Sequence, residues 1–435
     1  MKTLDYIPTG KLQRAGKLVS TGVKIGGNYI KYVGEKITNP EEAKQNFDQN
    51  NAEDIYDGLK SLKGSALKVA QMLSMEKNML PAAYVDKFSL AQFSVPPLSG
   101  PLVRKTFKRY LGNYPEDIFD QFTAESVNAA SIGQVHKATL DGKKLAVKIQ
   151  YPGVANSISS DLTLVKPVAT RLFNLKGKDS EKYFKEVEGK LLEETDYTLE
   201  LKQSREITDA CSMIPNLKFP NYYEDLSCDK ILTMDWMEGV HLSEYTSDLK
   251  DLDQARVVGQ TLWDFYMYQM HVLKRVHADP HPGNFLIDEK GSLIAIDFGC
   301  IKNVPEDFYT PYFELATKEA MADRDFFVEK ITALEILRAD DSDEDSAYIT
   351  QLFHELLGVL TFPFHNETFD FSDELFWNKV AHMSERLSQD EKLRKLNGNR
   401  GSKHFLYINR TFFGLYNLLH DLKAEIVVNN YKKFI

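Results

Sequence analysis

The residues with the clearest chemical meaning are two aspartates and an asparagine. Asp279 and Asn284 stand five residues apart in His277-Ala-Asp-Pro-His-Pro-Gly-Asn284, and Asp297 follows in Asp297-Phe-Gly299. Short apolar runs flank a turn at 288–292, which predicts a strand–turn–strand that brings the two segments together. Amide and carboxylate oxygens are ligands that Mg²⁺ prefers, and a carboxylate can accept a proton. The spacing therefore predicts a magnesium–phosphate site, with Asn284 and Asp297 on the metal and Asp279 as base or water-orienting group.

A protein-kinase catalytic loop uses the same five-residue interval, followed by Asp-Phe-Gly after a short hairpin. The Arg of the common His-Arg-Asp is absent here, and Ala278 stands in its place. His277 and His281 are four apart, a spacing that binds zinc on a helix. Pro280 and its neighbour Pro282 oppose a helix there, and no third ligand is spaced nearby, so zinc is disfavoured.

Composition limits the class of protein. The chain has 435 residues, 43% hydrophobic and 27% charged, with a net charge of −10. An acidic balance opposes general nucleic-acid binding. The three cysteines show no metal or disulfide spacing, which indicates a reducing compartment. No apolar run of spanning length is present, so we expect a cytoplasmic chain.

The N-terminal segment 1–50 is basic, with apolar residues between its lysines. It is interpreted either as a peripheral contact with an anionic membrane surface or as a frayed arm. Gly22, Gly26 and Gly27 weaken a continuous helix and favour the arm. Helices are then expected from 39, over 52–75 and over 103–111. Lys68 and Gln71 share one helical face in the second of these.

A β-rich segment follows. We expect strands between 122 and 149, joined at the hairpin turn Asp141-Gly142. The stretch 128–133 is expected to be a loop in the position of a kinase phosphate-covering loop, although only Gly133 of its three glycines is kept. Lys148, in Leu145-Ala-Val-Lys148, matches the kinase lysine that contacts the α- and β-phosphates.

An inward-facing lysine in an apolar strand needs an anionic partner. The next helix, expected over 181–210, offers Glu193, Glu194, Asp196 and Glu200. Spacing alone does not choose among these four acids. Because Glu194 and Glu200 are six apart, they do not lie on one line of a helix, which indicates that two of the acids serve different directions.

Later segments fit a second, helical part. The strand and turn 231–239 occupy the place of a kinase hinge, and a long helix is expected over 252–276. After Gly299 the chain leads at once into a helix expected over 306–321, which leaves little room for a peptide platform. This favours a small-molecule or lipid substrate, or none, over a protein substrate. The acidic run 340–345 is expected to be a solvated loop, because Ser346 and Leu352 stand where an EF-hand needs Gly and Glu. The remaining residues are expected to be helical.

Together these motifs resemble the UbiB/AarF atypical kinase-like family. The similar stretches are Lys63-Gly-Ser-Ala-Leu-Lys-Val-Ala-Gln-Met-Leu-Ser74, Asn128-Ala-Ala-Ser-Ile-Gly-Gln-Val-His136, Leu145-Ala-Val-Lys-Ile-Gln-Tyr-Pro-Gly153, Glu194-Thr-Asp-Tyr197 and His277–Asn284. The resemblance implies that Lys68 and Gln71 face the pocket from an N-terminal extension, which Glu194 and Asp196 contact. It also implies that Glu200 is the ion-pair partner of Lys148.

The resemblance implies an activity as well. The family is associated with ATP binding and hydrolysis in the biosynthesis of ubiquinone and other isoprenoid lipids. ATP and Mg²⁺ are the expected cofactors, and a prenyl lipid or quinone precursor is the expected partner. The chain departs from the family pattern at Ala70 and Asn128, which are expected to tune the site. A nucleotide-sensing scaffold with negligible turnover and a protein kinase are the alternatives.

The sequence thus predicts an α+β, two-lobed protein-kinase-like fold with an N-terminal helical extension. The expected parts are a basic arm (1–50), the extension (51–120), a β-rich N-lobe with a long acidic helix (121–239) and a helical C-lobe (240–435). The predicted nucleotide-binding residues are Asn128, Ala129, Ala130, Ser131, Gly133, Val135, Lys148, Met234, Asp235 and Met237.

Overall fold

A computed structural model describes residues 24, 27–29, 31–32, 35–36, 39–62, 97–130, 132–172, 177–390, 392–393, 396 and 400–434. The chain divides into two compact units. The first comprises residues 1–201, 222–236 and 387–390, and the second comprises 202–221, 237–386 and 391–435. Each unit is described separately.

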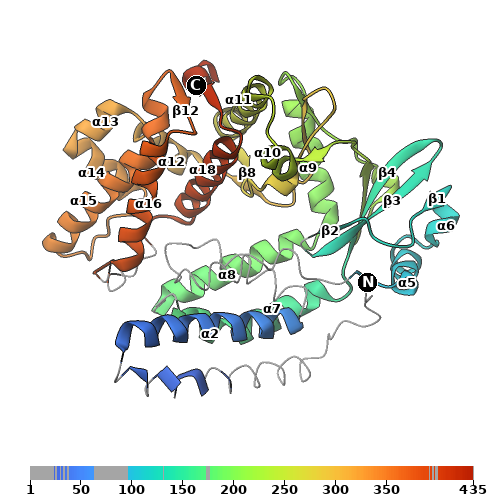
Figure 1. The fold of residues 1–435 in the computed structure, drawn as a ribbon, viewed down its shortest axis with the longest axis horizontal. Coiled ribbons are helices and arrows are strands. Elements are labelled where there is room, and N and C mark those ends of the chain that lie inside the picture. The colour runs from blue at the N-terminus through green and yellow to red at the C-terminus, as the bar shows by residue number, and fades with distance from the viewer. Residues whose placement is uncertain are drawn as a thin grey trace. The chain divides into compact units, whose positions relative to one another are not determined.

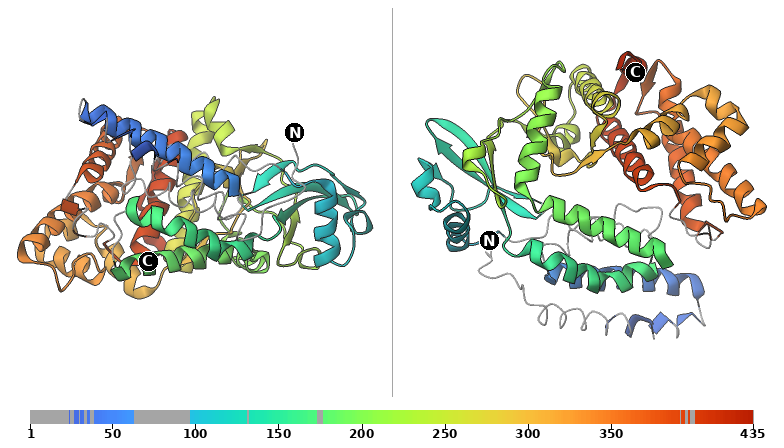
Figure 2. Two further views of the ribbon diagram at one scale, coloured as in Figure 1. Left: turned by 90° about the horizontal axis from the view of Figure 1, so that it is seen from below. Right: turned by 180° about the vertical axis from the view of Figure 1, so that it is seen from behind.

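The first unit is built on an antiparallel sheet in the order β1-β3-β4-β6, with β2 paired to β3 (Figure 1). Its strands are β1 (Gln121–Phe122), β2 (Asn128–Ala130), β3 (Gly133–Leu140), β4 (Lys143–Gln150) and β6 (Ile231–Asp235). Figure 2 shows the long β3–β4 hairpin from two further directions. Leu145, Val147 and Ile149 of β4 pack against Val103 and Phe107. This apolar cluster fixes one face of the sheet.

The turn between β3 and β4 forms as expected at Asp141-Gly142. Both residues have positive φ, 50° and 75°. Two successive left-handed residues make the turn whose twist suits a two-residue hairpin. The expectation of a loop over 128–133 is wrong in part. Asn128, Ala129 and Ala130 pair with Val135, Gln134 and Gly133, so these three residues form a strand.

The helices of the first unit precede and follow these strands along the chain. They are α2 (Pro40–Leu62), α5 (Gly100–Tyr110), α6 (Pro115–Ile118), α7 (Val154–Leu172) and α8 (Gly177–Glu194), with the short 3₁₀ turn η2 (Glu224–Leu226). The prediction of a single helix over 181–210 is wrong, because the helical stretch is interrupted. It breaks at Thr195–Asp196, and α9 (Tyr197–Cys211) starts afresh and carries the chain into the second unit.

Strands of the second unit form three small sheets. The largest has the order β5-β10-β9-β7, while β11 pairs with β8 and β12 with β13. Their bounds are β5 (Leu217–Lys218), β7 (Val240–His241), β8 (Arg275–His277), β9 (Phe285–Ile287), β10 (Leu293–Ala295), β11 (Ile301–Asn303), β12 (Thr368–Asp370) and β13 (Glu425–Val427).

Helices supply most of the second unit's core. They are α10 (Leu242–Ser247), α11 (Leu252–Tyr268), α12 (Glu306–Glu314), α13 (Lys318–Ala322), α14 (Arg324–Ala333), α15 (Asp343–Leu360), α16 (Glu374–Gln389) and α18 (Lys403–Asp421). Short turns of helix are η3 (Gln269–Leu273), η4 (Pro282–Asn284), η5 (Phe362–His365) and η6 (Asn429–Phe434). Trp263, Phe265 and Tyr416 are among its fully buried side chains.

Three expectations for this unit need correction. The helix over 252–276 ends at Tyr268; a π-helical turn follows, and Lys274 with φ 50° redirects the chain into β8. The helix over 306–321 is two helices, because Thr317 caps a new start by accepting a hydrogen bond from Ala320 N. The C-terminal part also contains the antiparallel pair β12–β13.

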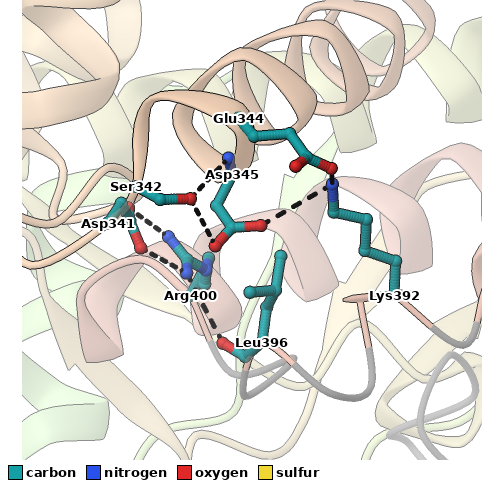
Figure 3. A network of polar contacts seen from close by, with 7 residues as sticks. All are labelled: Asp341, Ser342, Glu344, Asp345, Lys392, Leu396 and Arg400. Atoms are coloured by element: carbon teal, nitrogen blue, oxygen red, sulfur yellow. Dashed lines mark hydrogen bonds and ion pairs between the residues drawn. The ribbon is translucent and has the colours of Figure 1, made fainter.

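The acidic run 340–345 is not simply a solvated loop (Figure 3). The Asp341 side chain is only 6% exposed, and its two carboxylate oxygens accept hydrogen bonds from the two Nη atoms of Arg400 at 2.6 Å. Ser342 caps α15 by accepting a hydrogen bond from Asp345 N. The expectation failed because Arg400 is 59 residues further along the chain.

Within the described ranges, no helix has both the length and the apolar composition needed to cross a membrane.

Candidate active site

A buried ion pair lies on the sheet of the first unit. Lys148 Nζ is 2.6 Å from Glu200 Oε1, and both side chains are buried. The Lys148 ammonium also lies 5.1 Å from the centroid of the Tyr197 ring. Of the four acids that the sequence left open, Glu200 is therefore the one that meets Lys148. Glu193 is exposed and pairs with Lys190 instead.

The break between α8 and α9 positions Glu200. Asp196 Oδ1 accepts hydrogen bonds from the backbone N–H groups of Thr198 and Leu199, as a helix N-cap does. The carbonyl of Thr195 accepts hydrogen bonds from Gln150 and Lys230. These contacts fix the start of α9 beside β4, and Glu200 lies in its first turn.

The register of the sheet aligns several predicted residues. Asn128 is opposite Val135, Val135 is opposite Lys148, and Lys148 is opposite Leu232. Residues opposite one another in neighbouring strands share a face. Met234 is two residues beyond Leu232, so it lies on that face too. The predicted nucleotide residues Asn128, Val135, Lys148 and Met234 are thereby brought together.

Other predicted residues of the first unit take different positions. Asp235 Oδ1 accepts a hydrogen bond from Tyr223 OH at 2.7 Å. Gly133 allows close packing, because an added Cβ would lie 2.3 Å from the Ile149 carbonyl oxygen. Glu194 is half-buried at the end of α8. Ser131, Lys68 and Gln71 lie outside the described residues, as does the basic arm's first part, 1–23.

The second unit contains the three residues of the predicted magnesium–phosphate site, Asp279, Asn284 and Asp297. Asn284 Nδ2 donates to the carbonyl oxygen of Asp279 at 2.9 Å, and Asn284 in turn accepts from Ile296 N. The β9–β10 hairpin pairs Phe285 with Ala295, so Asn284 and Asp297 emerge at the same end of the hairpin. Asp297 Oδ1 accepts a hydrogen bond from Gly299 N at 2.8 Å. Sequence spacing predicted this return of the chain correctly.

His277 supports this loop from the core. It lies in β8, opposite Ile301 of β11, and its ring packs edge-on against Phe298. Burial lowers the pKa of His277, against the opposing charges of Asp279 and Asp297. His281 Nδ1 accepts a hydrogen bond from Gly283 N. Among the described residues no group of three or more His, Cys, Asp or Glu side chains could hold a metal ion.

Sequence reasoning missed Arg410. Its Nη2 lies 3.1 Å from Asp279 Oδ1, and it comes from α18, far along the chain. Nothing in the local sequence marks Arg410, because it stands in an ordinary amphipathic helix without a motif of its own. Met237, the last predicted nucleotide residue, is half-buried just after β6.

Fold and side chains together define a kinase-like protein. Residues 90–331 match the ABC1 atypical kinase-like domain. The chain belongs to this family of atypical kinases, as the UbiB/AarF resemblance implied.

Two relatives illustrate the range of similarity. The chloroplastic protein ACTIVITY OF BC1 COMPLEX KINASE 8 of Arabidopsis thaliana is 32% identical over 55% of this chain and 32% of its own length. The chain thus spans about a third of that relative. The mitochondrial atypical kinase COQ8 of Saccharomyces cerevisiae is 27% identical over 86% of this chain and 75% of its own length.

A solved structure supports the fold. The Rv3197–erythromycin complex from Mycobacterium tuberculosis superposes with a TM-score of 0.62, at 24% identity, over 91% of this chain and 97% of that chain. The expected α+β, two-lobed kinase-like fold is confirmed.

Proposed function

We propose that this chain is an MgATP-dependent ATPase or small-molecule phosphotransferase. The observation that carries the proposal is the buried Lys148–Glu200 ion pair at 2.6 Å, in a chain of a kinase-like family. Burying two charges is costly, and the attraction between them rarely exceeds that cost by much. A pair retained at this cost is better explained by binding phosphate than by stability.

In this proposal Lys148 contacts the α- and β-phosphates, and Glu200 holds its ammonium in place. Asn128, Ala129, Ala130, Ser131, Gly133 and Val135 surround the nucleotide, while Met234, Asp235 and Met237 contact the adenine. The row of side chains that joins Val135 to Lys148 across β3 and β4 supports this assignment. Lys68 and Gln71 belong to a regulatory N-terminal extension, which Glu194 and Asp196 contact.

Asn284 and Asp297 are the proposed magnesium ligands. An amide oxygen and a carboxylate suit Mg²⁺, which usually takes one or two protein ligands and completes its shell with phosphate and water. The Asn284 side-chain nitrogen already donates to the Asp279 carbonyl, which orients its oxygen as the acceptor. Bound Mg²⁺ would neutralise charge on the phosphates. Asp279 is the proposed base or water-orienting group.

The proposed setting is quinone or other isoprenoid-lipid metabolism, at a peripheral membrane contact or in the cytoplasm. Support comes from the family resemblance and from the short link after Gly299, where β11 and α12 follow directly. That link leaves little chain for a peptide platform, which disfavours a protein kinase. A nucleotide-sensing scaffold with negligible turnover is the second candidate.

The test is phosphate release from MgATP, measured with and without anionic liposomes or a phenolic quinone precursor. Asp297→Asn is expected to lower turnover by about 100-fold or more, because one carboxylate of the metal site is lost. Asp370→Asn is the matched control, since Asp370 Oδ1 accepts from Ser372 N in the same local geometry.

Turnover unchanged in Asp297→Asn would contradict the metal assignment. MgATP binding in a thermal-shift assay without phosphate release under any of these conditions would favour the scaffold.

A further inference from the structure

The carboxylate of Asp279 has a cationic partner from a distant part of the chain. Arg410 Nη2 lies 3.1 Å from Asp279 Oδ1, and both side chains are about a quarter to a fifth exposed, at 24% and 21%. In the family resemblance, Ala278 stands where a protein kinase has an arginine beside its catalytic aspartate. In this chain the guanidinium next to the aspartate is that of Arg410, which comes from α18.

One face of α18 contacts the loop at adjacent points. Residues four apart in a helix lie on the same face. Arg410 contacts Asp279, and Gly414 packs against Pro280 so closely that an added Cβ would lie 2.3 Å from Pro280 Cγ. Tyr407, one turn earlier, lies with its ring centroid 4.0 Å from Lys302 Nζ, in the strand after Asp-Phe-Gly.

The other side of α18 is anchored in the core of the second unit. Ile408, Phe412, Leu415 and Leu419 recur at helical spacing and are fully or almost fully buried. Phe412 packs edge-on against Phe364, and its ring lies parallel to that of Tyr312. A helix held in this way gives Arg410 a fixed base from which to orient Asp279.

The position of Arg410 in the sequence sets it apart from the family match. The ABC1 domain match ends at residue 331, and Arg410 lies well beyond it. Partly exposed ion pairs add little to stability. The contact of Arg410 with Asp279 is therefore better explained by positioning than by stability.

We propose that Arg410 is a positioning residue for Asp279, and that α18 is part of the active site. This rests on the proposed ATP-dependent function. The guanidinium holds the carboxylate in one orientation toward the acceptor hydroxyl or water, and a misplacement of about 1 Å is enough to cost about 100-fold in rate.

Arg410→Gln and Arg410→Lys test the proposal in the full chain. In Arg410→Gln, kcat for MgATP hydrolysis should fall at least about tenfold while the KM for ATP changes by less than about threefold, since Arg410 acts on Asp279 and not on the nucleotide. Arg410→Lys keeps the charge but not the planar fork, so it should recover part of kcat. Arg386→Gln is the control, because it breaks another arginine–carboxylate pair, with Glu355, in the same unit.

A double-mutant cycle separates positioning from a structural effect. In the Asp279→Asn background, Arg410→Gln should lower the residual turnover by less than about twofold, because its partner is already gone. Circular dichroism and thermal melts establish that each variant is folded. If Arg410→Gln does not fold, Arg410→Lys takes its place in the same cycle.

Each outcome has a distinct meaning. If the wild-type chain hydrolyses MgATP and Arg410→Gln has the same kcat, the role of Arg410 is overturned and the proposed function still stands. Equal losses in the wild-type and Asp279→Asn backgrounds would also overturn it. A wild-type chain without turnover under all conditions would overturn the proposed function and this inference together.

Discussion

At the scale of single residues, two ion pairs have side chains that are almost completely shielded from solvent. Lys148 contacts Glu200 directly, and Asp341 contacts Arg400. Removing one partner leaves an uncompensated charge in the core, which costs far more than the intact pair contributes. Each pair therefore constrains its surroundings strongly, whatever its net effect on stability.

The Asp341–Arg400 pair predicts a pH-dependent stability. Hydrogen bonds from Arg400 lower the pKa of Asp341 below its usual value of 3.8. A group whose pKa is lower in the folded state stabilises the protein above its unfolded pKa and loses this contribution as the pH falls through the folded pKa. Asp341→Asn should therefore lower the free energy of unfolding by about 3 kcal/mol at pH 7.

Urea unfolding at a series of pH values measures this effect. The difference between wild type and Asp341→Asn should shrink as the pH falls below about 4, where the carboxylate of the unfolded chain binds a proton, and should be lost below the lower pKa of the folded state. The neighbouring Asp340 is exposed, so Asp340→Asn should change stability by less than about 0.5 kcal/mol. A difference that is constant from pH 7 to pH 2 would argue against the ionic account.

At the scale of elements, short connections set the geometry of the candidate site. The break at Thr195–Asp196 starts α9 so that Glu200 faces β4, and the β3–β4 turn sets the register that aligns Val135 with Lys148. A one-residue slip in that register would move Lys148 to the opposite face of the sheet.

Two glycine substitutions, one in the β3–β4 turn and one inside α8, should have opposite effects on the free energy of unfolding. Gly142 has a φ of 75° with no atom near an added Cβ, so Gly142→Ala should destabilise the protein by about 1 kcal/mol through backbone strain alone. Gly189 lies inside α8, also with open space around it, so Gly189→Ala should stabilise by up to about 1 kcal/mol. Chemical denaturation of both variants gives the comparison, and the same sign for the two would contradict it.

At the scale of the whole molecule, the second unit depends on residues far beyond the family match. Its core joins α11 and the β9–β10 hairpin to side chains of α15, α16 and α18. The chain after residue 331 is thus part of the scaffold that holds the loop of Asp279, and is not an appendage to it.

A large-to-small substitution in α18 tests this dependence. Phe412 is almost fully buried, so Phe412→Ala should cost about 3–5 kcal/mol, from lost burial and the cavity left behind. Leu375 is 72% exposed, so Leu375→Ala should cost less than about 0.5 kcal/mol. Thermal and urea unfolding provide the measurement, and a small effect at Phe412 would mean that α18 packs only loosely.

The sequence by itself determined the features that depend on neighbours within a few residues. These are the hairpin turn at Asp141-Gly142, the strand–turn–strand that returns Asp297 to Asn284, and the need of Lys148 for an acid. Local turn chemistry and side-chain period fix such features, since they involve only consecutive dihedral angles. Helix ends were less predictable, because the break at Thr195 depends on contacts from Gln150 and Lys230.

Only the tertiary structure decided which distant groups meet. Glu200 lies 52 residues from Lys148, Arg400 lies 59 from Asp341, and Arg410 lies 131 from Asp279. No periodicity links residues so far apart; their contacts follow from how whole helices pack on strands and loops. The motif of Asp279, Asn284 and Asp297 was therefore evident from the sequence, whereas the arginine that contacts Asp279 was not.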